Sequence, residues 1–395
     1  MTESTETLEQ QEQLVQTLRT AVYSQTDPLT DPDLHSRLVA AEARLREWSE
    51  TSGTPQQQDD SKELAIPAPR GRLLGPETTG LKVESTLHMQ PIPTGIYHLL
   101  DPETDPLVTV SVFNARRETR RLCIKVYLEG LSAQAVRTVE VKRDQTVPIK
   151  MLPILLPERA RLITEVQRAT LHVMVEDLDH KPECHDTFSV VCLARTSSFN
   201  SVRKPETGER VDLSHYYGAW VTPYVESVQE RIRAAADLSP KKQLWGYQIS
   251  RELVNEQVSV LYQSLKEANI VYINSIIDYR GIGHYATQRT RLPSESIASR
   301  SANCIDGTVL MASLLEGTSL NPVLVLVPGH AFVGWETWRG SGEWRFLETT
   351  MIGSSSFAQA MQSAQRQYDA HQQQGNKITL HPVSELRKRG IWPME

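Results

Sequence analysis

The stretch that decides the fold of the last third of the chain reads Ser301-Ala-Asn-Cys-Ile-Asp-Gly-Thr-Val-Leu-Met-Ala-Ser-Leu-Leu. Apolar residues at 305, 309 and 312 recur at helical spacing, which predicts a helix over about 305–316 with Cys304 at its start. The exposed amide N–H groups and the dipole at a helix start favour a thiolate over a thiol. Cys304 is therefore a candidate nucleophile.

Two residues further along the chain complete a set of nucleophile, base and acid. His330 follows Pro328-Gly at the start of a predicted strand, 26 residues after Cys304, and Glu348 lies in the next predicted strand, 18 residues later. A nucleophilic thiolate needs an imidazole beside it, and the imidazole needs a third group to orient it. Because a helix packed on an antiparallel sheet brings these positions together, we expect Cys304, His330 and Glu348 to form a triad.

This arrangement resembles the transglutaminase-like core, whose superfamily is related to the papain-like cysteine hydrolases. The resemblance covers about 250–391, roughly a third of the chain, and includes the approach segment 288–297 and the signature 303–306. It implies an α+β catalytic domain with a Cys-His-Asp triad. Glu348 stands where most of the family has aspartate, which is a departure from the family pattern.

A second departure concerns the group that would stabilise an oxyanion, since the family's usual tryptophan near the nucleophile is absent. We expect the backbone N–H of Cys304 to be the main donor, with Gln288 as a second candidate. Asn303 and Asp306 are assigned supporting positions, and Asp306 is interpreted as a cap of the predicted helix.

The triad predicts a protease that cleaves amide or isopeptide bonds of a protein or peptide substrate through a thioester. The same triad supports acyl transfer to an amine, or deamidation of glutamine, because only the acceptor differs. A third hypothesis is an inactive interaction scaffold. No metal or organic cofactor is expected, because the histidines and cysteines over 180–192 lack the spacing of a zinc module.

Composition bounds the remaining function classes. The 42 basic and 48 acidic residues give a net charge of −6, which offers no electrostatic reason to bind nucleic acid or an anionic membrane. We find no secretory signal and no apolar run of about 18 residues that would span a bilayer. Four cysteines in 395 residues do not form a disulfide framework, so a reducing cytoplasm is expected.

Changes in hydrophobic periodicity predict a multi-domain α+β chain. Apolar residues at helical spacing near the N-terminus indicate a helical hairpin that could bind a protein partner, and alternating residues after 85 indicate an immunoglobulin-like antiparallel β-sandwich. The predicted parts are a hairpin over 1–50, a linker over 51–84, the sandwich over 85–197, a connector with one helix over 198–247, and the transglutaminase-like domain over 248–395.

Within the last part, the pattern predicts three helices and several antiparallel strands. The helices are expected at 249–268, 305–316 and 357–373, and the strands at 322–328, 330–338 and 343–350. The connector is expected to hold a helix at about 222–236.

Overall fold

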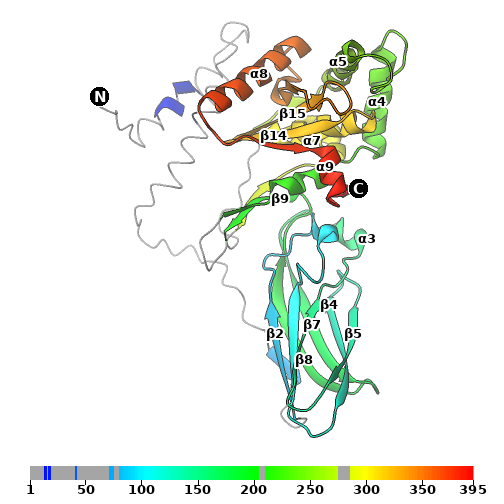
Figure 1. Ribbon diagram of the computed structural model, residues 1–395, viewed down its shortest axis with the longest axis vertical. Coiled ribbons are helices and arrows are strands. Elements are labelled where there is room, and N and C mark those ends of the chain that lie inside the picture. The colour runs from blue at the N-terminus through cyan, green and yellow to red at the C-terminus, as the bar shows by residue number, and fades with distance from the viewer. Residues whose placement is uncertain are drawn as a thin grey trace.

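The computed structural model describes residues 13–15, 17–18, 41, 71–74, 80–203, 210–274 and 285–394. It is a mixed α+β structure with several antiparallel sheets, as predicted. Most of the hairpin predicted over 1–50 lies outside the described residues. Figure 1 shows sheets at one end of the long axis and a helix-rich part at the other. Among the described residues, no helix is long and apolar enough to cross a membrane.

Two antiparallel sheets share one apolar core at the first end. Alternation builds this core: in β3 the side chains of Val108, Val110 and Val112 are fully buried, and Ile124 and Val126 of β4 meet them from the other sheet. One sheet has the order β1 (Gly71–Leu74), β8 (Pro182–Cys192), β7 (Gln167–Asp177), β4 (Arg120–Leu128), β5 (Ala135–Val141), and the other has the order β2 (Leu81–Leu87), β3 (Val108–Asn114), β6 (Thr146–Met151).

The linker predicted over 51–84 is wrong in its last part, because β1 and most of β2 fall within it. β1 pairs with β8 and β2 pairs with β3, so each extends a sheet. β2 is short and contains two charged residues, so the sequence alone does not identify it as a strand. Its two buried positions, Leu81 and Val83, become informative only when β3 is seen beside them.

We expect a chain that begins at Ser85 to be much less stable than one that begins at Gly71. The shorter chain loses β1, Leu81 and Val83, and these two buried side chains together contribute about 3–6 kcal/mol. Thermal melts of the two chains check this. Equal melting temperatures would contradict the assignment of β1 and β2 to the folded sheets.

The connector predicted over 198–247 is not a simple connection. β9 (Ser197–Arg203) lies at the centre of a three-stranded sheet, between β10 (Arg210–Asp212) and β12 (Tyr285–Arg289). The 3-10 helix η2 (Ser214–Trp220) and the helix α4 (Glu226–Leu238) then bury Tyr217, Trp220 and Val228 in the core of the helix-rich part. Because β9 and β12 are more than 80 residues apart, local patterning did not reveal their pairing.

A four-stranded antiparallel sheet forms the centre of the helix-rich part, in the order β16 (Trp344–Leu347), β15 (His330–Glu336), β14 (Pro322–Val327), β17 (Thr379–Pro382). Alternate residues of β14 enter different apolar clusters, with Leu324 in the cluster that contains α7 (Cys304–Gly317). Val323 and Val325 enter the cluster that contains Ala364 of α8 (Phe357–Gln373). The sheet is therefore covered by α7 on one face and by α8 on the other (Figure 1).

The helices predicted in the last part are confirmed, α8 with the predicted bounds, and the strands predicted at 322–328 and 330–338 are present as β14 and β15. The strand predicted at 343–350 is wrong in its second half, because β16 ends at Leu347 and Glu348 caps the 3-10 helix that follows it. The connector helix is also present, as α4. The remaining elements are α3 (Pro157–Ala160), α5 (Arg251–Glu267), α6 (Pro293–Ser299), α9 (Val383–Lys388), the 3-10 helices η1 (Tyr97–Leu99) and η3 (Thr349–Met351), and the paired strands β11 (Val271–Tyr272) and β13 (Ser301–Ala302).

Arg387 in α9 fixes η2 against the end of α7. Its guanidinium donates to Glu316 of α7 through two nitrogens, at 2.9 and 2.7 Å. The same group donates to the carbonyl oxygens of Gly218 and Val221. Bidentate pairing of this kind gives directional restraint as well as energy. Arg387 thereby sets the position of η2, which carries Tyr217.

Candidate functional site

Cys304 is the first residue of α7, and the side chains on either side of it define where the helix begins. Asn303 accepts a hydrogen bond from the N–H of Asp306 at 2.9 Å, and Asp306 accepts one from the N–H of Asn303 at 3.2 Å. This reciprocal capping satisfies two of the free groups of the first turn. The Cys304 side chain lies at the helix N-terminus and is partly exposed, whereas the other three cysteines are buried.

His330 is the first residue of β15 and pairs with Val327 of β14 across a tight turn. Gly329 lies in that turn at φ +73°, in the left-handed region that favours glycine. The turn places His330 at the end of a central strand of the sheet, where the residue is 8 % exposed. His330 Nε2 lies 2.7 Å from Glu348 Oε2, which leaves Nδ1 as the ring nitrogen not bonded to the carboxylate.

Glu348 directly follows β16, and its length suits its place in the sheet. Extending the register Val333↔Leu347 by one pair places Glu348 opposite Phe332, diagonal to His330. Diagonal positions lie about 7–8 Å apart, a separation that long side chains can span. The extra methylene of glutamate, relative to the aspartate of the family pattern, therefore suits this diagonal contact.

Four donors hold the buried Glu348 carboxylate. Thr350 donates to Oε1 through its N–H at 3.0 Å and its hydroxyl at 2.8 Å. Gln367 of α8 donates to Oε2 at 2.8 Å, on the same oxygen that holds His330. A buried carboxylate with all of these partners keeps its ring contact in one geometry.

Electrostatics favour a charged His330–Glu348 pair. Burial alone would lower the pKa of His330, but the charge of Glu348 and the hydrogen bonds to Cys304 and Glu348 raise it to about 10. Burial would likewise raise the pKa of Glu348, but the imidazolium and the Thr350 hydrogen bonds lower it to about 2. An imidazolium beside Cys304 is the charge that a thiolate requires.

Asn303 and Asp306 act on the helix and the neighbouring chain in this structure. Asp306 is 1 % exposed and accepts from the N–H of Arg291 at 2.8 Å, with the guanidinium of Arg291 at 3.3 Å. Burial raises the pKa of Asp306 to about 6, although the backbone N–H groups of Arg291 and Asn303 oppose this shift. Asp306 thereby joins the first turn of α7 to the segment that follows β12.

Gln288 lies in β12, three residues before that junction. Its Oε1 accepts from the hydroxyl of Tyr217 at 3.4 Å, and its backbone carbonyl accepts from Ser198 at 2.9 Å. Burial raises the pKa of Tyr217, and negative charge at Cys304 raises it further.

Sequence reasoning missed three side chains around the triad: Tyr217, Thr350 and Gln367. Thr350 could have been suspected, because a hydroxyl two residues after a buried acid often bonds to it. Gln367 is one of several glutamines in α8, and Tyr217 lies between apolar residues of η2. Nothing in the local sequence distinguishes those two.

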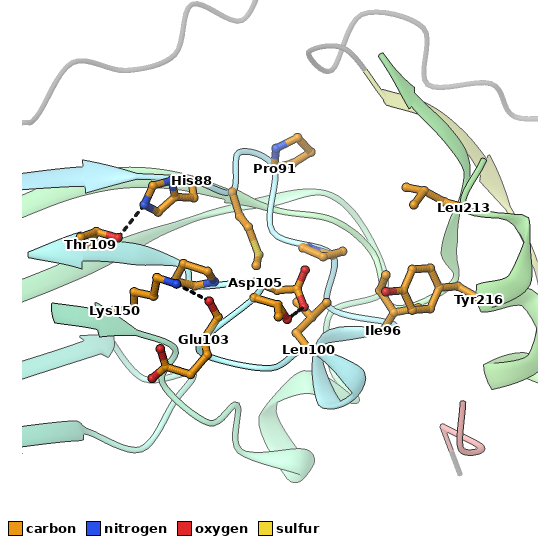
Figure 2. Close-up of a pocket in the computed structure, with 14 residues that line it drawn as sticks. His88, Pro91, Ile96, Leu100, Glu103, Asp105, Thr109, Lys150, Leu213 and Tyr216 are labelled. Atoms are coloured by element: carbon orange, nitrogen blue, oxygen red, sulfur yellow. Dashed lines mark hydrogen bonds between the residues drawn. The ribbon is translucent and has the colours of Figure 1, made fainter. Parts of the chain in front are cut away.

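A cavity of about 450 Å³ lies elsewhere, where the two-sheet part meets η2 (Figure 2). Pro91, Ile96 and Leu100 line it from one side, and Leu213 and Tyr216 line it from the other. None of the three triad residues lines this cavity. Figure 2 shows Tyr216 beside Ile96 at this cavity. The next residue of η2, Tyr217, contacts Gln288 instead.

The described residues contain no group of three or more histidine, cysteine, aspartate or glutamate side chains arranged to hold a metal ion. Of the residues considered as metal ligands, His180 lies in the turn between β7 and β8, and Cys184, His185 and Cys192 lie in β8. Comparisons with protein-family models, with curated proteins and with solved structures find no match to this chain.

Proposed function

We propose that this chain is a cysteine hydrolase that cleaves amide or isopeptide bonds with Cys304 as nucleophile, His330 as acid and base, and Glu348 as the group that orients the imidazole. One observation carries the proposal: the buried His330 imidazole is bonded to Glu348, and Glu348 and Cys304 together raise its pKa. Order along the chain, with Cys304 opening α7 and His330 opening β15, supports the further proposal that the helix-rich part is transglutaminase-like.

The mechanism follows from the position of each group. The Cys304 thiolate adds to the substrate carbonyl carbon, and the negative charge moves to the carbonyl oxygen. The backbone N–H of Cys304, at the start of α7, is an oxyanion donor of the kind that first-turn amides provide. The His330 imidazolium then gives its proton to the amine as the C–N bond breaks, leaving a thioester and a neutral imidazole.

Hydrolysis of the thioester uses the same side chains. His330 takes a proton from water, the resulting hydroxide adds to the thioester carbonyl, and the C–S bond breaks to release the carboxylic acid and the thiolate. His330 is then an imidazolium again. An amine in place of water would give acyl transfer, so a protein-glutamine acyltransferase or deamidase is the alternative within the same site, and an inactive scaffold is the alternative without chemistry.

We propose that the two-sheet part is an immunoglobulin-like sandwich and that the helices predicted over 1–50 bind a protein partner. None of the four cysteines forms a disulfide, which supports a reducing compartment such as the cytoplasm.

Alkylation by iodoacetamide tests the thiolate directly. We expect Cys304 to react at a nearly constant rate from pH 9 down to pH 6, because the His330 cation keeps the sulfur ionised. In His330→Ala the rate should fall about tenfold per unit below pH 8, as for an ordinary thiol. Mass spectrometry of the labelled peptides gives the rate at each cysteine.

Three buried cysteines, Cys123, Cys184 and Cys192, are internal controls in the same sample, and they should stay unlabelled while the chain is folded. If the Cys304 rate falls with pH in the same way in the wild type and in His330→Ala, the ion pair does not form. The scaffold would then replace the enzyme as the better hypothesis.

A further inference from the structure

A glycine stands at the end of the first turn of α7, where the helix meets the segment that follows β16. Gly307 is buried, and its N–H donates to the carbonyl of Asn303 at 2.9 Å, so it belongs to the regular helix. Its φ is not in the left-handed region that favours glycine. Alanine is the better helix former in such a conformation, so the property of Gly307 that matters here is the absence of a side chain.

Thr349 occupies the space beside this glycine. A Cβ at position 307 would lie 2.8 Å from Thr349 Oγ1 and 3.0 Å from Thr349 Cβ, whereas carbon atoms in favourable contact lie about 3.5–4.0 Å apart. Thr349 is buried, and its hydroxyl lies 3.5 Å from the carbonyl oxygen of Cys304. The turn that carries the proposed nucleophile and the first residue of η3 are therefore in direct contact.

The residues on either side of Thr349 hold the proposed imidazole. Glu348 comes directly before it, and its Oε2 lies 2.7 Å from His330 Nε2. Thr350 comes directly after it and donates to Glu348 through its N–H and its hydroxyl. The segment 348–350 thus contacts both the helix that carries Cys304 and the ring that would activate it. A displacement of Thr349 away from α7 would move the carboxylate, and the ring with it.

Both sides of this contact are anchored. The hydroxyl of Tyr262 in α5 donates to the carbonyl of Met351 at 2.8 Å, and a carbonyl of α8 accepts from the N–H of Glu348 at 3.2 Å. On the other side, Asp306 joins the first turn of α7 to the N–H of Arg291 at 2.8 Å. An added methyl group would therefore be forced between two fixed segments, and their separation would have to grow.

We propose that Gly307 and Thr349 form a spacer that sets the distance between Cys304 and the His330–Glu348 pair. The missing side chain at 307 lets η3 approach α7, and Thr349, the positioning residue, ends that approach. The inference rests on the proposed function, since the distance matters only if the His330 cation keeps the Cys304 sulfur ionised. It adds two residues that lie outside the triad.

Gly307→Ala adds one methyl group to the contact. We expect alkylation of Cys304 by iodoacetamide at pH 6 to fall about 10- to 100-fold, since a misplacement of about 1 Å can cost about 10²-fold. At pH 9 the rate should fall less than about threefold, because a thiol with the ordinary pKa of about 8.5 is mostly ionised there without a neighbouring cation. The two rates, nearly equal in the wild type, should therefore become very different.

A swap of the carbon atom tests whether the two residues act through one contact. Gly307→Ala combined with Thr349→Gly removes the clash, since the next atom of residue 349 lies 3.8 Å from the added Cβ. Thr349→Gly alone should lose less of the pH 6 rate than Gly307→Ala, because Tyr262 and α8 still hold η3. The double variant should react within about threefold of Thr349→Gly, a non-additive result expected of residues in contact.

Gly317→Ala is the matched control, because Gly317 is the last residue of the same helix. A Cβ there would lie 2.6 Å from Ile232 Cδ1 and 3.3 Å from the carbonyl oxygen of Pro223, so this substitution crowds α7 at its other end. It should lower the melting temperature and leave the ratio of the pH 9 and pH 6 rates unchanged.

The results that overturn the inference differ from those that overturn the proposed function. The spacer is refuted if Gly307→Ala keeps the wild-type ratio of rates, or if the double variant does not regain the pH 6 rate. If Gly307→Ala does not fold, the double variant decides: folding with the ratio of Thr349→Gly supports the spacer, and failure to fold refutes it. If wild-type Cys304 reacts at pH 6 no faster than an ordinary thiol, the proposed function itself fails, whatever residue stands at 307.

Discussion

Cys304→Ala is expected to abolish turnover while the chain keeps its fold. The Cys304 side chain is partly exposed, so alanine leaves little cavity and changes the free energy of unfolding by about 1 kcal/mol or less. The contacts that define the helix start do not involve sulfur, because Asn303 and Asp306 cap α7 through their own side chains and backbone. Thr308 donates to the backbone carbonyl of Cys304, which alanine retains.

Two measurements check this result. Thermal melts should agree within a few degrees, since about 1 kcal/mol shifts the melting temperature by only a few degrees in a chain of this size. Activity-based profiling of the wild type and Cys304→Ala in a lysate, followed by mass spectrometry, should show cleaved peptides with the wild type alone. New isopeptide bonds or deamidated glutamines in place of cleaved peptides would favour the acyltransferase alternative.

Cys192→Ala is the matched control, because Cys192 is fully buried in the core of the two-sheet part. It should lower the melting temperature and leave turnover unchanged. A large loss of melting temperature in Cys304→Ala would instead identify Cys304 as a packing residue.

Glu348→Gln is expected to reduce turnover about 10- to 1000-fold, with His330→Ala distinctly worse. Loss of an orienting carboxylate costs about 10⁴ in a serine protease, and a cysteine nucleophile needs less help because its thiolate forms more readily. A glutamine side chain also presents an NH₂ group where Glu348 presents an acceptor oxygen. Thr350 donates twice to one oxygen, and His330 and Gln367 donate to the other, so the new NH₂ group faces donors at either end.

The pH dependence of this variant has a definite sign. The pKa of His330 is raised to about 10, so its contribution to stability is fully present below pH 6.5 and is lost as the pH rises through about 10. The pKa of Glu348 is lowered to about 2, so its contribution is present above pH 4.5 and is lost as the pH falls through about 2. In Glu348→Gln, burial acts on His330 without the opposing carboxylate. The imidazolium should therefore be lost at lower pH, and the rate profile should narrow on its alkaline side.

Glu336→Gln provides the comparison for that variant. Glu336 lies in the same strand as His330, is 6 % exposed, and accepts hydrogen bonds from Asn321 and the N–H of Gly342. Its replacement should lower stability by about 1–3 kcal/mol, the usual cost of leaving a buried donor unsatisfied. Turnover and the pH profile should be unchanged. Unaltered kinetics in Glu348→Gln would place the third member of the triad elsewhere.

The sequence predicts the candidate site best where a reactive side chain stands at the start of a helix or a strand. Cys304 at a helix start and His330 at a strand start could be placed because caps and turns lie within three residues of them. The predicted contact of His330 with Glu348 needed only the pairing of two neighbouring strands. These residues lie close together in the structure, although their chemistry stays a prediction.

Residues brought in from distant parts of the chain could not be found in this way. Tyr217 reaches Gln288 across 71 positions, and Ser198 reaches Thr290 across 92. Such contacts depend on the pairing of β9 with β12, whose short strands have no strong alternation. The same limitation explains why β2 was included in a linker, since its partner β3 begins more than 20 residues after it.

The sheet formed by β10, β9 and β12 determines at which residue the two-sheet part can be exchanged for that of another protein. β9 starts at Ser197, five residues after β8 ends, and the carbonyl of Thr196 accepts from the N–H of Thr290 at 2.7 Å. A chimaera that exchanges the two-sheet part at the predicted boundary after 197 would take Thr196 away with it. A joint before Leu193, which belongs to the core of the helix-rich part, keeps that contact. The transferable unit therefore ends with β8.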